Sequence, residues 1–231
     1  TTGVISQIYG GGGAPASTTT FNCDYVELHN ISSVVQDISG FKLAYGSSGG
    51  VLGGQQSNRF TFPANTTIPP GGYLLLADSG LAGGANPQLT VTRDFYFRFA
   101  MSATKGKIVL GTSALIDSAF LADQPAGAVV DFIGYGTATE YEGSTAAGGT
   151  TNTSAALRNN SGCDDTNQNS ADFTIGAPNP RNSATPVFIC GSATNPVLGA
   201  TSLAPFGNVC ITNPSPASGS FSISGSNLTA G

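Results

Sequence analysis

The residue types best suited to chemistry gather between Gly162 and Asn182, where three Asp and four Asn stand in one stretch. Only 9% of the whole chain is charged, so this concentration of acidic side chains is unusual. Calcium takes about six to eight oxygen ligands, and carboxylate and amide oxygens supply them. The candidate calcium ligands are Asp164, Asp165, Asn167, Asn169 and Asp172.

The spacing of this cluster follows a calcium loop only at its start. Asp165, Asn167 and Asn169 occupy alternate positions. An EF-hand loop would continue with Gly and end on Glu, but the chain has Ser170 and Gly176 there. The same side chains are suited to hold backbone groups in consecutive Asx-turns. We favour turns, keep calcium as the alternative, and expect no other cofactor.

Groups that could act in catalysis are few. His29 is the sole histidine of the chain. We interpret His29 as a half-exposed strand residue. Glu140 and Glu142 would share one face of an extended segment, as glycosidase carboxylates do, but they read as solvated charges at a hairpin tip. Gly10 to Gly13 precede no G-K-[ST], so they predict a loop and no phosphate cradle. The chain is therefore not expected to be an enzyme.

Charge and hydropathy exclude two classes of partner. The net charge is −5, and the eight Lys and Arg are scattered, so no basic stripe for nucleic acid exists. No run of 18 apolar residues is present, so membrane insertion is not expected. Thr1-Thr2-Gly3 lacks the pattern of a signal peptide, which we take to have been removed or omitted.

The four cysteines lack the C-x-x-C spacing of zinc or redox sites. Three disulfide pairings are open. We favour Cys23 with Cys163, which ties distant parts of one domain, and Cys190 with Cys210, which closes a C-terminal loop. Each closure would contribute roughly 3 to 5 kcal/mol in the chain-entropy picture. Disulfides and low charge predict an exported, extracellular protein, and four reduced buried thiols are the alternative.

The elements that must position these residues are short strands. With 32 Gly and 13 Pro, long helices are disfavoured. Apolar residues alternate in short runs that end in turn residues, which predicts an antiparallel sandwich or barrel. The predicted strands are Val4 to Tyr9, Tyr25 to His29, Phe41 to Tyr45, Arg59 to Phe62, Tyr73 to Ala77, Phe95 to Phe99, Lys107 to Leu110, Val129 to Tyr135 and Pro186 to Cys190.

A family resemblance sharpens this fold class. Its motifs are Ile5-Ser6-Gln7-Ile8-Tyr9 before four glycines, Asp24-Tyr25-Val26-Glu27-Leu28-His29-Asn30, Ile38-Ser39-Gly40-Phe41-Lys42-Leu43, Ile68-Pro69-Pro70-Gly71-Gly72-Tyr73, Gly106-Lys107-Ile108-Val109-Leu110, Val130-Asp131-Phe132-Ile133-Gly134-Tyr135-Gly136, Tyr141-Glu142-Gly143 and Asn179-Pro180-Arg181-Asn182. In this order they resemble the lamin tail domain in its bacterial secreted form. The resemblance implies an all-β, immunoglobulin-like antiparallel β-sandwich over residues 1–185. It also implies a non-catalytic module of the kind appended to secreted nucleases, phosphatases or surface proteins.

Residues 186–231 form a C-terminal strand or linker region, and no side chain from 191 onward is charged. The stretch 225–229 resembles the opening of an Ig-like repeat of secreted Bacteroidota proteins. The region is then either the start of a next module or a donor strand that adds to a neighbouring copy. Head-to-tail addition of this kind would build a fibre. The candidate donor residues are Ser220, Phe221, Ile223 and Leu228.

These observations predict a secreted or cell-surface structural or adhesive module. A fibre subunit assembled by C-terminal strand exchange is one alternative. An accessory module that binds cell envelope or carbohydrate for a secreted nuclease or phosphatase is the other. The expected partners are other modules of the same protein or identical subunits, with a cell-envelope or glycan ligand as a further possibility.

Overall fold

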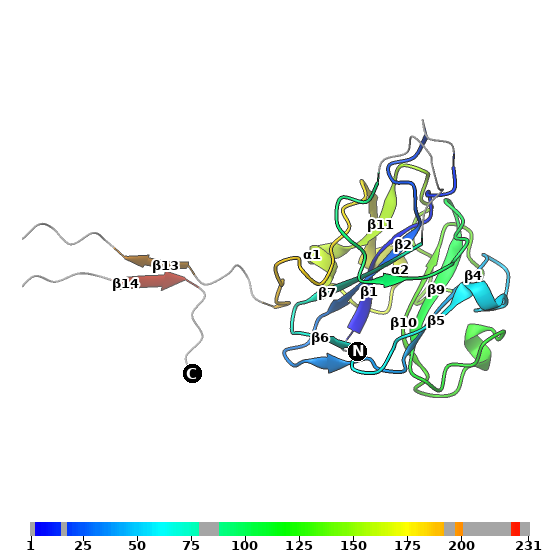
Figure 1. The fold of residues 1–231 in the computed structure, drawn as a ribbon, viewed down its shortest axis with the longest axis horizontal. Coiled ribbons are helices and arrows are strands. Elements are labelled where there is room, and N and C mark those ends of the chain that lie inside the picture. Colours follow the sequence, from blue (N-terminus) through cyan, green and yellow to red (C-terminus); the bar gives the residue numbers. More distant parts are fainter. Residues whose placement is uncertain (1–2, 15–17, 79–87, 192–196, 201–222, 227–231) are drawn as a thin grey trace, which may run out of the picture. The chain divides into compact units, whose positions relative to one another are not determined.

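The structure is a computed structural model that describes residues 3–14, 18–78, 88–191, 197–200 and 223–226. The chain divides into two units, Thr1–Cys190 and Gly191–Gly231 (Figure 1). The described part of the first unit consists mainly of strands, with two four-residue helices, α1 (Asn159–Gly162) and α2 (Asn169–Asp172).

Two sheets build the first unit. The larger has the order β12-β11-β1-β2-β7-β8. Its strands are β12 (Phe173–Gly176), β11 (Ala155–Arg158), β1 (Gly3–Tyr9), β2 (Tyr25–Asn30), β7 (Tyr73–Ala77) and β8 (Phe95–Tyr96). Only the short β8 pairs in parallel in this sheet, and every other pairing is antiparallel.

The smaller sheet has the order β10-β9-β4-β5, with all pairs antiparallel. Its strands are β10 (Val129–Tyr135), β9 (Gly106–Gly111), β4 (Lys42–Gly46) and β5 (Arg59–Thr61). A further two-stranded sheet pairs β3 (Gln36–Asp37) with β6 (Thr67–Ile68). The antiparallel, immunoglobulin-like β-sandwich predicted from the sequence is confirmed.

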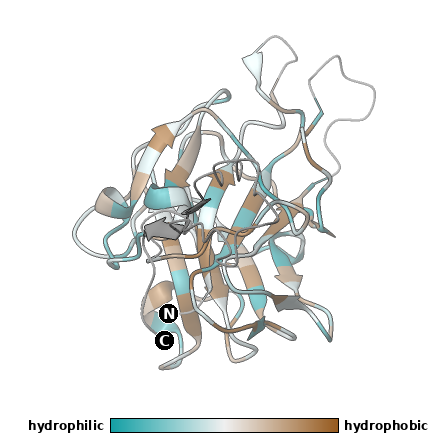
Figure 2. Ribbon diagram, turned by 90° about the vertical axis from the view of Figure 1, so that its left-hand side faces the viewer, coloured by the Kyte–Doolittle hydropathy of each residue, from teal (hydrophilic) through white to brown (hydrophobic). Residues whose placement is uncertain are grey.

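The main core lies between the two sheets, where apolar side chains from both meet. Val26 and Leu28 of β2 face it, together with Leu43 of β4 and Ile108 of β9. Tyr25 contributes instead to a second apolar cluster with Phe21, so both faces of β2 are covered. Because both faces are covered, the strands are mainly hydrophobic. Figure 2 shows this, and it also shows hydrophilic segments within the strands.

A β-bulge decides which side chains of β1 reach the core. Ile5 and Ile8 are three positions apart, so a regular strand would send them to opposite faces. The register of β1 against β2 shifts between Ile5 and Gln7, and the extra residue brings both isoleucines into the main core. Strand alternation then places Tyr9 in the second cluster.

Eight of the predicted strands are present with nearly the expected bounds, although β8 is shorter. The predicted strand from Pro186 to Cys190 was wrong, because this stretch makes only isolated contacts such as the Phe188 N–H to the Gly71 carbonyl, 2.8 Å. β11 and β12 were not anticipated, since Ala155–Arg158 and Phe173–Gly176 are four residues long and show little alternation.

In the second unit, β13 (Val197–Ala200) pairs antiparallel with β14 (Ile223–Ser226). Ile223 of the predicted donor strand begins β14. Ser220, Phe221 and Leu228 lie outside the described residues.

Candidate functional site

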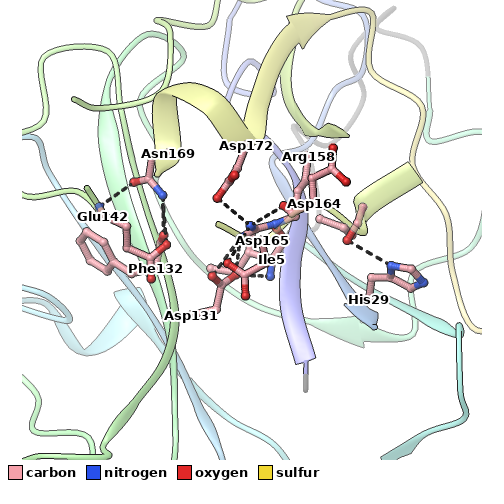
Figure 3. Close-up of polar contacts among 12 residues, drawn as sticks. Ile5, His29, Asp131, Phe132, Glu142, Arg158, Asp164, Asp165, Asn169 and Asp172 are labelled. Carbon is pink, nitrogen blue, oxygen red and sulfur yellow. Dashed lines mark hydrogen bonds and ion pairs between the residues drawn. The ribbon is translucent and has the colours of Figure 1, made fainter. Parts of the chain in front are cut away.

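A buried ion pair joins the two sheets. Arg158 ends β11, and its Nη2 lies 2.8 and 2.7 Å from the two carboxylate oxygens of Asp131 in β10 (Figure 3). The Arg158 Nε donates to the carbonyl of Ile5 in β1, 2.9 Å, and the Ile5 N–H donates to Asp131. The side chains of Arg158 and Asp131 are 0% and 1% exposed. A buried charge is tolerated only when it is paired and hydrogen-bonded, so each group requires the other.

The same guanidinium also holds the loop of residues 164–172, which is called the Asp/Asn loop below. Its Nη1 donates to the carbonyl of Asp164, 3.0 Å, and to a carboxylate oxygen of Asp165, 3.3 Å. Asp172 completes the arrangement with a carboxylate oxygen 3.5 Å from that nitrogen. Three of the five predicted calcium ligands, Asp164, Asp165 and Asp172, therefore contact the side chain of Arg158.

Asp172 closes the loop on itself. Its carboxylate accepts hydrogen bonds from the N–H of Thr166, 3.0 Å, the hydroxyl of Thr166, 2.6 Å, and the N–H of Gln168, 3.2 Å. Asn167 lies between Thr166 and Gln168 and is exposed. Its φ of 55° is a left-handed conformation that Asn adopts more readily than most residues. Asp172 thus holds backbone groups of the loop, but those of residues that precede it, so it does not form the Asx-turn that we favoured from the sequence.

Asn169 occupies the open edge of β10. Its side-chain oxygen accepts from the N–H of Gly134, 2.8 Å, and its amide nitrogen donates to the carbonyl of Phe132, 2.9 Å. One amide thus makes the two bonds that a neighbouring strand would make, and it also accepts from the N–H of Glu142, 3.1 Å (Figure 3). Asn169 therefore blocks strand addition at this point of the sheet.

A cluster of carboxylates does form here, but with a different membership from the one predicted. Oxygens of Asp131, Glu142 and Asp165 lie within 4.8 Å of one another. Burial raises the pKa of Asp131 to about 6, against the opposing effect of Arg158. Burial also raises the pKa of Glu142 to about 8, and the Asp131 charge adds to that rise. Calcium binding by the loop stays a prediction.

Glu140 and Glu142 are not the solvated hairpin tip that the sequence indicated. Glu140 forms a salt bridge with Lys107, whose side chain is 0% exposed, and accepts from the N–H of Leu121, 2.6 Å. Glu142 is half-buried and accepts from the Asn169 amide, 3.2 Å. Both were misjudged because the groups that cover them are remote in sequence.

His29 is fully buried, so its interpretation as a half-exposed residue was wrong. Its ring stacks on Tyr73, with centroids 4.3 Å apart. Nδ1 lies 3.2 Å from the carbonyl oxygen of Gly162, and Nε2 lies 3.1 Å from that of Phe188. Burial lowers the pKa of His29. Among the described residues no hydrogen bond joins His29 to a serine or a carboxylate.

A second buried ion pair anchors the segment that follows β12. The guanidinium of Arg181 lies 2.7 Å from the carboxylate of Glu27, which is 0% exposed. Arg181 also donates to the Ser161 carbonyl and the Tyr73 hydroxyl, each 2.9 Å away, and its guanidinium carbon lies 4.0 Å from the Tyr73 ring centroid. The sequence signal that could have marked Arg158 and Arg181 is the scarcity of cations in this chain.

The disulfide joins Cys163 to Cys190, so the predicted pairs Cys23–Cys163 and Cys190–Cys210 were wrong. Cys23 is buried and, within the described residues, carries a free thiol. Burial raises its pKa to about 12. Cys210 lies outside the described residues. The prediction chose the pairs by their separation in the sequence. In the structure the contacts of Arg158 and Arg181 bring residues 163 and 190 together.

A family model of the lamin tail domain matches residues 4–137, more than half of the chain. The chain belongs to the lamin tail domain family. In this lamin tail domain the match runs from β1 through β10, whereas Arg158, the Asp/Asn loop and the disulfide follow the matched region. No curated protein matches the chain.

The immunoglobulin-like fold of a lamin tail domain fits a non-catalytic module. In the described parts of the chain, no helix has the length and apolar character needed to cross a membrane.

Proposed function

We propose that this lamin tail domain is a non-catalytic structural or adhesive module of a secreted or surface protein. The observation that carries the proposal is how two buried cations and one half-buried cation are used. Lys107, Arg158 and Arg181 each bind a carboxylate of the chain itself. Catalysis requires reactive groups that face a substrate, whereas these groups hold loops onto the sheets.

The disulfide and the composition support an extracellular setting. The Cys163–Cys190 bond would persist in an oxidising compartment, and the cytosol keeps most thiols reduced. A chain with only 9% charged residues is also typical of exported β proteins. Thiol trapping of the endogenous protein, combined with cell fractionation, tests this. Reduced Cys163 and Cys190 in a cytosolic fraction would contradict it.

Exposed apolar side chains supply a contact surface for another module or an identical subunit. Val34 and Val35 are 58% and 59% exposed, and Val187 is 53% exposed. The segments that carry them meet at Gly71, whose N–H donates to Asn30 and whose carbonyl accepts from Phe188. Apolar groups gathered in this way on a soluble protein commonly mark an interaction site.

The fibre alternative is supported by the second unit. In the two large sheets of the first unit the outer strands are poor acceptors: β5 has three residues, β8 has two, β12 is followed by Pro178, and Asn169 occupies the edge of β10. β13 and β14 pair only with each other among the described strands, and neither has a charged residue. A donor strand from a second copy would therefore add to this two-stranded sheet.

Native mass spectrometry and electron microscopy test the fibre. The full chain would form concentration-dependent polymers, and deletion of residues 219–231 would leave monomers. A monomer in both cases ends the fibre alternative and leaves the structural module.

The accessory-module alternative is tested with a glycan array and with pulldown on isolated cell envelopes. Binding there, abolished by serine substitutions at Val34 and Val35, would favour the accessory module. Absence of binding would favour the structural one. Turnover of phosphodiester, phosphomonoester or glycoside substrates above background would contradict the non-catalytic proposal itself.

A further inference from the structure

We infer that His29, Cys163 and Cys190 form a redox-gated site for a thiophilic divalent cation such as zinc, which the disulfide closes and reduction opens. The ligand atoms of the three residues lie within 4.8 Å of one another, and all three side chains belong to the first unit. Two thiolates and one imidazole are a donor set that zinc takes in proteins. This inference does not depend on the proposed structural or adhesive role.

The contacts of His29 leave one nitrogen of the neutral ring without a proton to donate to the carbonyl oxygen that it faces. A neutral imidazole has one N–H and one lone pair. Both nitrogens face carbonyl oxygens, those of Gly162 and Phe188, which only accept hydrogen bonds. One of these contacts is therefore a hydrogen bond, and the other places a lone pair opposite an acceptor. A metal ion would use that lone pair after the facing carbonyl group turns aside, while the remaining N–H keeps its carbonyl partner, as is usual for zinc-bound histidines. Figure 3 shows the His29 ring with one of its two carbonyl contacts.

The turn before Cys163 fixes the place of one sulfur. Asn160, Ser161 and Gly162 have φ values of 51°, 57° and 96°, a left-handed stretch that is unfavourable for non-glycine residues. Hydrogen bonds to its carbonyls hold it: Ser161 accepts from Tyr73 and Arg181, and Gly162 lies against His29. These bonds do not involve Cys190, so they do not require the disulfide.

The geometry and charge of the site suit a metal. The Cα atoms of Cys163 and Cys190 lie 5.5 Å apart. Tetrahedral zinc would place two sulfurs about 3.8 Å apart at Zn–S distances of about 2.3 Å. Both cysteines are half-buried, which leaves their side chains room to rotate after reduction. Two thiolates neutralise Zn²⁺, so no further acid is needed, and Glu27 stays bound to Arg181. Water would take the fourth position.

A phosphine reductant transfers two electrons to the disulfide, becomes the phosphine oxide with an oxygen from water, and leaves two thiols. Zinc then displaces the two thiol protons and accepts the imidazole lone pair. The link between residues 163 and 190 would thus be kept under both oxidising and reducing conditions.

Metal titration of the full chain tests the inference. Cys23→Ala and Cys210→Ala form the background, so that only Cys163 and Cys190 remain as thiols. After phosphine reduction, Co²⁺ should give a thiolate charge-transfer band and tetrahedral d–d bands at one equivalent. Zinc should abolish these bands. The oxidised chain should bind neither metal, and Cys190→Ser should remove the charge-transfer band or reduce it by about half.

His29→Gln separates the proposed site from simple dithiol binding. Loss of a ligand should weaken zinc affinity at least about 100-fold, the upper end of the effect known for outer-shell partners. X-ray absorption spectroscopy of the zinc-loaded Cys23→Ala, Cys210→Ala protein detects an imidazole ligand directly. This measurement tests the inference even if His29→Gln does not fold. Absence of one-to-one binding after reduction would overturn the proposal. Unchanged affinity in His29→Gln, or no imidazole signal, would overturn it equally.

Discussion

The Nη2 nitrogen of Arg158 lies 2.7 and 2.8 Å from the two carboxylate oxygens of Asp131, and neither side chain is more than 1% exposed. Arg158 comes from the larger sheet and Asp131 from the smaller one. The pair therefore closes the sandwich at the edge where β1, β10 and β11 meet, and it fixes the loop that follows.

Arg158→Met should destabilise the protein by about 3–5 kcal/mol, because it leaves Asp131 buried without its cation. Urea unfolding followed by circular dichroism measures the loss. Adding Asp131→Leu should recover part of it, since no unpaired charge then remains. Arg98→Met is the matched control at an exposed arginine and should change stability by less than about 0.5 kcal/mol. Equal effects at both arginines would refute the buried-pair interpretation.

Asn169→Ala should cost about 1–3 kcal/mol, because it leaves the Gly134 N–H and the Phe132 carbonyl of β10 without partners. Hydrogen exchange at the Gly134 amide should accelerate, and the exposed edge should raise aggregation during refolding. Gln55→Ala, at an exposed position, is the control. Unaltered protection of Gly134 would show that Asn169 does not occupy the edge.

Stability should fall as the pH rises from about 4 to about 7, and Asp24 is one cause. Burial raises the pKa of Asp24 to about 7, and the Asp78 charge adds to this, whereas hydrogen bonds from Gly12 and Met101 oppose it. The folded state then binds the proton more tightly than the unfolded state, whose Asp pKa is about 3.9. This contribution is complete below pH 4 and is lost through pH 7.

Asp24→Asn should flatten that part of the pH profile, by at most about 4 kcal/mol between its ends. Urea midpoints between pH 4 and pH 8 give the comparison. Asp37→Asn is an informative control, because the Ser39 hydrogen bonds lower the pKa of this exposed carboxyl, so its effect has the opposite sign. A profile unchanged by Asp24→Asn would contradict the assignment.

The thiol of Cys23 should resist alkylation in the folded protein. Burial raises its pKa to about 12, and only the thiolate is nucleophilic. Mass spectrometry after an iodoacetamide pulse should find Cys23 modified only in urea. In the same peptide map Cys163 and Cys190 should appear as one disulfide-linked species. A linked peptide containing Cys23 and Cys163 would overturn the pairing described above.

Local patterns account for the parts of the fold that were predicted well. β2 alternates Tyr25, Val26, Glu27 and Leu28, and turns rich in Pro and Gly bound the strands, so strand positions could be read from neighbouring residues. The wrong strand at Pro186 to Cys190 has the same apolar content but no neighbouring strand to pair with. Pairing is a long-range property that composition does not report.

The candidate site was predicted less well because its contacts are remote in sequence. Arg158 binds Ile5, 153 positions away, and Arg181 binds Glu27, 154 positions away. The Asp/Asn loop was recognised as a special segment, but its ligand-like spacing did not reveal its contacts with Arg158. The disulfide was misassigned although its two cysteines are 27 positions apart, because the Arg158 and Arg181 contacts that hold the segments around them are remote in sequence.

By itself, the sequence determined an all-β fold, poor in charge and rich in turns, because strand alternation and turn chemistry are local. The lamin tail type of the sandwich came from the resemblance of its motifs to that family. Only the tertiary structure decided that Asn169 covers a strand edge, that His29 is buried beside a disulfide, and that Cys163 pairs with Cys190. Burial changes the role of a polar side chain. An Asp or Asn that would bind water or calcium at the surface must, inside the sandwich, form hydrogen bonds with the backbone and pair with the few cations packed against it.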